Sequence, residues 1–356
     1  MPGKSKKWIR CTALVLAGLA TLLLWETAYM IWCSLVQDFD TVSVRFEQEA
    51  DYRQVQKTLR SIQGNRPTFW REGKGESLMI EGRERTQTVD VFHFYGDGET
   101  VISARFLSGD YPPPSIDGGC VVSSSLCKEL WGSQEAIGKK LWSGKREYQV
   151  YGIFDSPEKL MLVQQYPREN VEFSAMETEL SMKRVQDYLR RNGLPSAQAV
   201  VNGPGVCWLL YQLVLLPFYV LLAMSLWRVR KTKWPKWGKI SLMLAGALLL
   251  FWLVFFPYQS ILQMIAKNFT NAAFWDELLR GLQVNLRTFF TLPVTHRDIL
   301  LGKQMLNLCL SAALAAAGMV LLVKRVVFRY CLRLPQDGKN PLSGKRLVRM
   351  HADFHE

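Results

Sequence analysis

The sequence predicts a membrane protein with four transmembrane α-helices plus an α+β extracytoplasmic domain. Apolar residues make up 49% of the 356 residues, an ordinary share for a soluble protein, but they concentrate in four long runs. The formal net charge is +13, and the basic residues gather beside the ends of those runs. The stretch between the first two runs has the length and the apolar alternation of a folded domain.

Each apolar run is long enough to cross a bilayer, whose hydrocarbon core of about 30 Å takes about 20 helical residues. The predicted transmembrane helices are 11–36, 206–227, 240–258 and 303–323. The other predicted segments are a basic N-terminus at 1–10, an extracytoplasmic domain at 37–205, a loop at 228–239, an extracytoplasmic connection with an amphipathic helix at 259–302 and a basic tail at 324–356.

The basic clusters orient the predicted helices. Residues 1–10, 228–239 and 324–356 are rich in Lys and Arg, which favour the cytoplasmic side of a membrane. We therefore expect a multi-pass protein of the cell membrane with both termini in the cytoplasm and 37–205 outside. Nucleic-acid binding is not expected, because a nucleic-acid binder carries its basic residues on a folded soluble face. The expected partner of these clusters is the lipid bilayer.

Three features of the apolar runs have two interpretations each. The run 11–36 fits an uncleaved anchor better than a cleaved signal peptide, because no A-x-A site follows it and it is too long. Glu26 is either a functional intramembrane carboxylate or a residue at the outer interface near Trp25 and Tyr29. The small residues of 311–318 either permit close helix packing or are simply good helix formers.

The predicted domain mixes strands and helices. Its most ordered pattern is 104–153, which predicts strand, turn, strand, helix, turn, strand, turn and strand. Strands are also expected at 41–46, 76–82, 86–96, 160–166 and 171–176, and amphipathic helices at 51–64 and 182–193. Strand–helix–strand units with interposed hairpins are typical of an α+β domain.

No catalytic constellation is visible, so neither an enzyme nor a cofactor is expected. The sequence has no G-x-x-x-x-G-K-[ST] motif for ATP and no G-x-S-x-G nucleophile elbow. No Cys and His spacing fits zinc, and the pair His351 and His355 is best explained as part of a frayed tail. A disulfide between Cys120 and Cys127 is conceivable outside the cell, although Cys127 also suits a small buried helix position.

The block 104–153 resembles the periplasmic core domain of MacB-like, or FtsX-like, ABC transporter permeases. The residues that carry the resemblance are Arg105, Phe106 and Asp110, then 120–123, 130–132, 136–139 with Leu141, and 148–153. Gly132 and Gly138 are expected to end a helix and to allow a tight turn. Ile137 and Leu141 are expected to anchor a strand, and Gly152 to redirect one.

The resemblance implies a permease subunit that forms a homo- or heterodimer and works with a separate ATP-binding cassette subunit. Such permeases act as mechanotransmitters, which convert nucleotide-driven motion inside into motion of the outer domain. The candidate ATPase contacts are the inner-loop residues Arg228, Arg230, Lys231, Lys233 and Trp234. This loop departs from the family in being short, basic and broken by Pro235. The alternative is a membrane-anchored regulatory or interaction module of the same fold without an active ATPase partner.

Overall fold

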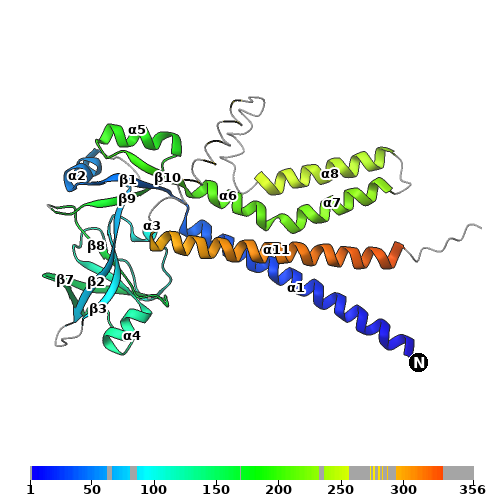
Figure 1. The fold of residues 1–356 in the computed structure, drawn as a ribbon, viewed down its shortest axis with the longest axis horizontal. Helices are drawn as coiled ribbons and strands as arrows, with labels where there is room; N and C mark the ends of the chain where they lie inside the picture. The colour runs from blue at the N-terminus through cyan, green and yellow to red at the C-terminus, as the bar shows by residue number, and fades with distance from the viewer. Residues whose placement is uncertain are drawn as a thin grey trace, which may run out of the picture.

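The computed structural model consists of a sheet-rich domain from which long helices extend (Figure 1). It describes residues 2–61, 66–80, 86–168, 170–231, 236–255 and 294–331, together with the single positions 273, 276, 280, 283 and 287. The long helices are α1 (Pro2–Asp38), α6 (Gly203–Val214), α7 (Leu216–Lys231), α8 (Lys236–Phe255) and α11 (His296–Cys331).

The sheet domain holds the strands β1 (Val42–Ala50), β2 (Thr68–Ile80), β3 (Gln87–Tyr95), β4 (Phe106–Gly109), β5 (Gly119–Ser123), β6 (Lys140–Ser143), β7 (Arg146–Phe154), β8 (Leu160–Gln164), β9 (Phe173–Thr178) and β10 (Ala197–Asn202). Its helices are α2 (Tyr52–Ser61), α3 (Gly98–Val101), α4 (Ser124–Trp131) and α5 (Met182–Asn192). The strands form one sheet in the order β10-β1-β9-β2-β3-β8-β5-β7-β4.

The first lobe of this domain has the ferredoxin-like arrangement. The units β1-α2-β2 and β9-α5-β10 interleave in the order β10-β1-β9-β2, with every neighbouring pair antiparallel. The amphipathic helices α2 and α5 bury their apolar sides against this sheet, where Val55 and Val185 meet Val44, Phe69 and Phe173. The lobe starts directly after α1 and ends directly before α6.

The second lobe is a ring of strands. The path β2-β3-β8-β5-β7 is closed by β6, which pairs with both β7 and β2. Its apolar interior includes Leu78, Val91, Cys120 and Leu141, and α4 contributes Leu126 to the same cluster. The 13-residue strand β2 belongs to both lobes and therefore connects them.

Two of the described helices are long and apolar enough to cross a membrane: Thr12–Asp38 of α1 and His296–Arg325 of α11. The predicted spans 11–36 and 303–323 lie within α1 and α11. The predicted span 206–227 is not one straight helix, because α6 and α7 meet at Leu215 with a bend of 45°. Pro217 explains the break, since proline lacks an N–H and collides with the preceding helical turn. The predicted span 240–258 overlaps α8, and its last residues lie outside the described part.

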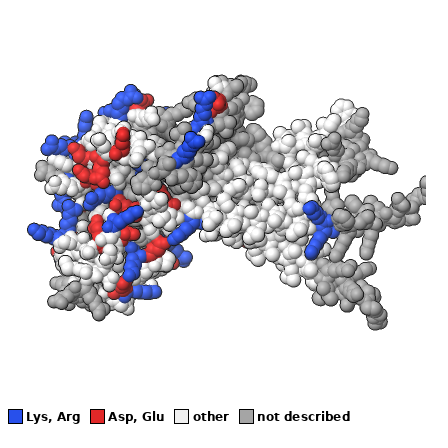
Figure 2. Space-filling view, in the orientation of Figure 1, with Lys and Arg blue, Asp and Glu red and all other residues white. Residues whose placement is uncertain are grey.

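The exposed face of α11 has a length that suits a bilayer. Leu306, Leu310, Leu314 and Leu321 are all more than half exposed on it, and the exposed cations Lys324 and Arg325 follow. Eighteen residues separate Leu306 from Lys324, which at 1.5 Å per residue spans about 27 Å. Figure 2 shows charge over the sheet domain and almost none along the long helices until a basic patch at their far end.

Part of the small-residue run 311–318 lies on the packed side of α11, whereas Ala313 and Ala317 are exposed. Ala312, Ala315 and Ala316 are buried, and a Cβ on Gly318 would come within 2.5 Å of the Thr21 hydroxyl of α1. Close approach of the two helices thus requires glycine at 318. Glu26, by contrast, is exposed on α1, about 18 Å along the helix from Asp38 by its rise.

Candidate coupling junction between the sheet domain and the long helices

Three helix ends meet the sheet domain at one place, which we call the junction. Asp38 ends α1, Gly203 begins α6 and His296 begins α11. The first two are in tight contact, because the Gly203 N–H donates to the Thr41 carbonyl at 3.2 Å and a Cβ there would lie 2.0 Å from the Phe39 carbonyl oxygen. The third inserts its first turn, His296-Arg297-Asp298, into the domain.

Arg297 is the central side chain of the junction. Its guanidinium lies 2.7 Å from a carboxylate oxygen of Glu177 on β9, and the two side chains are only 5% and 0% exposed. It also donates to the carbonyls of Thr100, at 2.9 Å, and Asp38, at 3.3 Å. One side chain therefore joins α11 to the sheet, to the end of α3 and to the last residue of α1.

Glu177 is held in place by further donors. Its carboxylate accepts hydrogen bonds from the Thr41 and Ser43 hydroxyls at 2.8 and 2.7 Å and from the Trp70 indole at 3.0 Å. A buried charge is tolerated only when it is paired and its remaining hydrogen-bonding capacity is used. Arg297 and its polar neighbours meet this requirement for Glu177.

A second ion pair lies beside the first. Arg45 of β1 reaches Asp298 at 3.3 Å and stacks over the Trp70 ring, 4.2 Å from its centroid. Asp298 also accepts from the backbone N–H and the hydroxyl of Thr295, at 3.0 and 2.6 Å. This T-x-x-D pattern caps the helix start and explains why α11 begins seven residues before the predicted 303.

Strand β2 holds α11 from another side. Both carboxylate oxygens of Glu72 lie 3.2 Å from the His296 backbone N–H, and Lys74 donates to the Val294 carbonyl at 3.0 Å. Desolvation raises the pKa of Glu72, and the His296 hydrogen bond only partly opposes it. On α1, the Asp38 carboxylate accepts from Gln304 at 3.0 Å. The junction therefore fixes α11 to β1, β9, β2 and α1.

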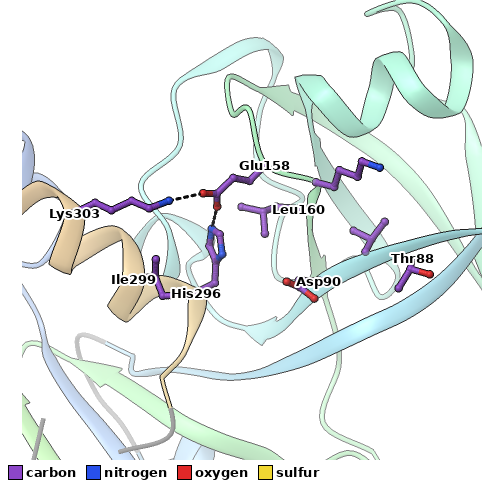
Figure 3. A pocket seen from close by; sticks show the side chains of 9 residues that line it. Thr88, Asp90, Glu158, Leu160, His296, Ile299 and Lys303 are labelled. Atoms are coloured by element: carbon purple, nitrogen blue, oxygen red, sulfur yellow. Dashed lines mark hydrogen bonds and ion pairs between the residues drawn. The ribbon is translucent and has the colours of Figure 1, made fainter. Parts of the chain in front are cut away.

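An open pocket of about 450 Å³ lies beside the first two turns of α11 (Figure 3). Glu158, in the loop before β8, is 2.8 Å from Lys303 and 2.5 Å from the His296 ring. The hydrogen bond from Lys303, helped by the charge of His296, lowers the pKa of Glu158 although burial opposes it. The wall opposite α11 includes Thr88, Asp90 and Leu160.

The junction is suited to mechanical connection. Its polar side chains pair with one another, and the described residues contain no group of three His, Cys, Asp or Glu side chains able to hold a metal ion. Its ion pairs and hydrogen bonds come from elements that are far apart in the sequence and end on one helix turn. Such an arrangement fixes the orientation of a helix relative to a sheet.

The family-motif residues lie in the second lobe. Gly152 is inside β7 and does not form the predicted turn; a Cβ there would lie 2.7 Å from the Phe106 ring and 2.8 Å from the Asp110 carbonyl. The Arg105 carbonyl accepts from the Asp155 N–H at 2.9 Å. These residues let the edge strand β4 approach β7 closely.

The other motif positions are turns. Gly132 ends α4 with φ = 72° and Gly138 has φ = 81°, both in the left-handed region that glycine adopts without strain. Leu141 is fully buried, as expected for an anchor. Ile137 is 48% exposed, and its neighbour Ala136 occupies the buried position instead.

Cys120 and Cys127 are free thiols in the apolar interior of the second lobe. The Cys127 thiol donates to the Ser133 carbonyl at 3.1 Å. Burial raises the pKa of both thiols. Neither is therefore a reactive thiolate at neutral pH.

The predicted ATPase contacts lie apart from the junction in sequence and in structure. Arg228, Arg230 and Lys231 form the last turn of α7, at the end of that helix remote from the sheet domain (Figure 1). Lys233 and Trp234 lie outside the described residues. Of the amphipathic helix predicted at 274–290, the four described positions 276, 280, 283 and 287 are helical and exposed.

Three solved structures resemble the sheet domain. The periplasmic region of MacB from Actinobacillus actinomycetemcomitans matches 48% of this chain and 91% of its own, with 12% identity and a TM-score of 0.40. The extracellular domain of the noncanonic ABC-type transporter YknZ from Gram-positive bacteria matches 44% and 96%, with 11% identity and a TM-score of 0.35. A domain of a protein described as a permease, from Porphyromonas gingivalis, matches 42% and 80%, with 14% identity and a TM-score of 0.29.

These domains come from the class of proteins that the block 104–153 resembles. No protein-family model and no curated protein sequence matches the chain.

Proposed function

We propose that this chain is the permease subunit of an ABC-type transporter or mechanotransmission complex, which couples a separate cytoplasmic ATPase to an extracytoplasmic domain. The observation that carries the proposal is the buried pair of Arg297 and Glu177. It joins a helix long enough to cross a membrane to strand β9 of the sheet domain. The motif resemblance of 104–153 supports the ATPase as the partner and a dimer of permeases as the assembly.

The mechanism follows from the stiffness of this connection. A rotation or shift of α11 that begins at its cytoplasmic end would reach β9 through Glu177, β1 through Arg45 and β2 through Glu72. Because β2 takes part in both lobes, the displacement would pass into the whole domain. In the proposal α8 and the bent pair α6–α7 complete the four spans, and the last turn of α7 contacts the ATPase.

The test is purification of the tagged full chain from native membranes with its partners. We expect a nucleotide-binding subunit to co-purify, and we expect replacing Arg228, Arg230 and Lys231 together by glutamine to release it. Gln at the exposed lysines 128 and 145 on the sheet domain is the matched control and should leave the complex intact. Recovery of the unmodified chain with no nucleotide-binding subunit would contradict the proposal.

The alternative is a membrane-anchored regulatory or interaction module without an ATPase. The short basic segment 228–239 with Pro235 favours it, because it offers little surface for a coupling contact. The same purification separates the two. A complex with partners of the outer domain alone would support the alternative.

A further inference from the structure

The pocket beside α11 lies at the height of lipid headgroups if α11 spans a bilayer. The lipid-facing leucines begin at Leu306, and Lys303 and Ile299 lie about 5 Å and 10 Å beyond it along the helix. The headgroup layer on each side of the hydrocarbon core is roughly 5–8 Å thick. A volume of about 450 Å³ is within the range of pockets that bind small molecules.

The walls of the pocket carry charges of both signs. Asp90 projects from β3, and its Oδ1 accepts from the Gly75 N–H at 3.0 Å, which fixes the carboxylate. Lys303 lies on the opposite wall; its ammonium gives one hydrogen bond to Glu158, and its side chain is 59% exposed. An ammonium has three donors, so Lys303 retains capacity for a ligand. Lys159 also lines the pocket, but its ammonium pairs with Glu129 of α4 at 2.6 Å; Leu160 and Ile299 add apolar surface.

We propose that this pocket binds the headgroup of a phospholipid that carries a phosphate and a primary ammonium group, from the leaflet on the sheet-domain side. The ammonium donates hydrogen bonds to Asp90, and the phosphate accepts them from Lys303. The glycerol end lies on the Leu306 side of Lys303, and the acyl chains descend from it along the leucines of α11. The proposal needs α11 in a membrane but does not depend on an ATPase partner.

This arrangement predicts a defined selectivity. A choline headgroup has a quaternary nitrogen without N–H donors, so it cannot hydrogen-bond to Asp90. Phosphatidic acid has the phosphate but no amine. Phosphatidylethanolamine offers both groups and should be retained about tenfold better than either, the factor expected for one charge-assisted hydrogen bond.

The experiment is native mass spectrometry of the delipidated full chain in detergent. It is titrated separately with dioleoyl phosphatidylethanolamine, phosphatidylcholine, phosphatidic acid and free O-phosphoethanolamine. Equal retention of the three lipids would overturn the proposal, and this arm needs no variant. Binding of free O-phosphoethanolamine more tightly than the lipid would overturn the membrane as its source.

Variants locate the site. Asp90→Asn should reduce phosphatidylethanolamine retention about tenfold and leave phosphatidic acid unchanged, whereas Asp187→Asn on the exposed face of α5 should change neither. Lys303→Gln should weaken both lipids, with Lys128→Gln as its control. Full retention by the folded Asp90→Asn protein, with its melting temperature unchanged, would overturn the assignment.

Discussion

Arg297 and Glu177 form a charged pair where the apolar helix α11 enters the protein core. Taking two charges out of water costs several kcal/mol each, and the attraction between them recovers this only with good geometry and further hydrogen bonds. The donors around Glu177 and the two carbonyls that accept from Arg297 provide these bonds. The pair therefore fixes one orientation of α11 and makes the loss of one partner costly.

We predict that Arg297→Met lowers the free energy of unfolding by about 3–5 kcal/mol, because it leaves the Glu177 carboxylate buried without its cation. Thermal unfolding of the full chain in detergent would show the change. Arg190→Met is the matched control, since that side chain is 81% exposed, and it should have almost no effect. The double variant Glu177→Gln/Arg297→Met should lose less free energy of unfolding than the two single variants lose in sum. Simple additivity would contradict the coupling.

Glu158 gives a prediction on pH. Its pKa is lower in the folded protein than its usual value of 4.5, so its contribution to stability is complete above that value and is lost as the pH falls through the lower, folded value. Protonation removes the attraction to Lys303 and His296. On acidification below 4.5, the melting temperature of the unmodified chain should fall more than that of Glu158→Gln. Parallel curves for the two proteins would argue against this role.

Single residues differed in how far the sequence could predict them. Gly132 and Gly138 come directly after segments with an apolar or helical pattern. Their neighbours in the sequence are therefore enough to predict that they lie in turns. Arg297 has no local signal of its own, because its partners Glu177, Thr100 and Asp38 are remote in the sequence. The pattern T-x-x-D at 295–298 was an available sign of a helix start, and it would have placed the charged turn inside α11.

Among the elements, α1 and α11 form the most tightly packed pair of long helices. Gly318 faces Thr21, whose hydroxyl is in turn bound to the Ala17 carbonyl at 2.8 Å and cannot turn away freely. Gly302, in the same helix, has no atom within 4 Å of the position that a Cβ would take. The two glycines lie in one helix and differ in the space available for a side chain, so their substitutions can be compared directly.

We predict that Gly318→Ala destabilises the protein by about 1–3 kcal/mol, because the methyl group forces the helices apart. Gly302→Ala should instead be neutral or stabilising by about 0.5–1 kcal/mol, since alanine favours the helix. Melting temperatures in detergent would measure both. Thr21→Ala should restore much of the stability lost in Gly318→Ala, and a failure of this rescue would disprove the contact as the cause.

Two glycines of the second lobe make a similar pair. Gly132→Ala should lower the free energy of unfolding by about 1–2 kcal/mol. Free space surrounds the position, so the loss comes only from the strain of alanine in the left-handed conformation. Gly152→Ala should cost more, because the new methyl group meets the backbone of Asp110, which belongs to the loop after β4. Chemical denaturation of the full chain would rank the two. A larger loss for Gly132→Ala would contradict the close approach of β4 and β7.

The elements that the sequence predicted well are those with a clear period. The helices at 51–64 and 182–193 and the strands at 160–166 and 171–176 appear as α2, α5, β8 and β9. Of β2, only the second half was predicted, because the segment from Trp70 to Gly75 shows no alternation. The edge strand β10 was not predicted at all, since its six residues are defined as a strand by pairing with β1.

At the scale of the whole molecule, pairing between remote segments determines the architecture. The α+β class and the order of elements in 104–153 could be predicted from local patterns. The closure of the ring by β6 and the shared role of β2 could not, because both depend on contacts between strands far apart in the chain. The same holds for the junction.

The arrangement predicts on which side of the membrane each end lies. In intact cells, a membrane-impermeant maleimide should label Asp187→Cys on the sheet domain, whereas Lys324→Cys at the far end of α11 should react only after permeabilisation. The unmodified chain is the background control for its own cysteines. Labelling of both positions in intact cells would contradict a spanning α11.

The exposed leucine face of α11 also has a consequence for the choice of membrane. Its length of about 27 Å is bounded by the polar contact of Asp38 with Gln304 at one end and by Lys324 and Arg325 at the other. A stretch shorter than the bilayer core is matched by thinning of the bilayer, because tilting would shorten its span further. The protein should therefore be best matched to thin bilayers, and a thick sterol-rich bilayer would have to thin around it.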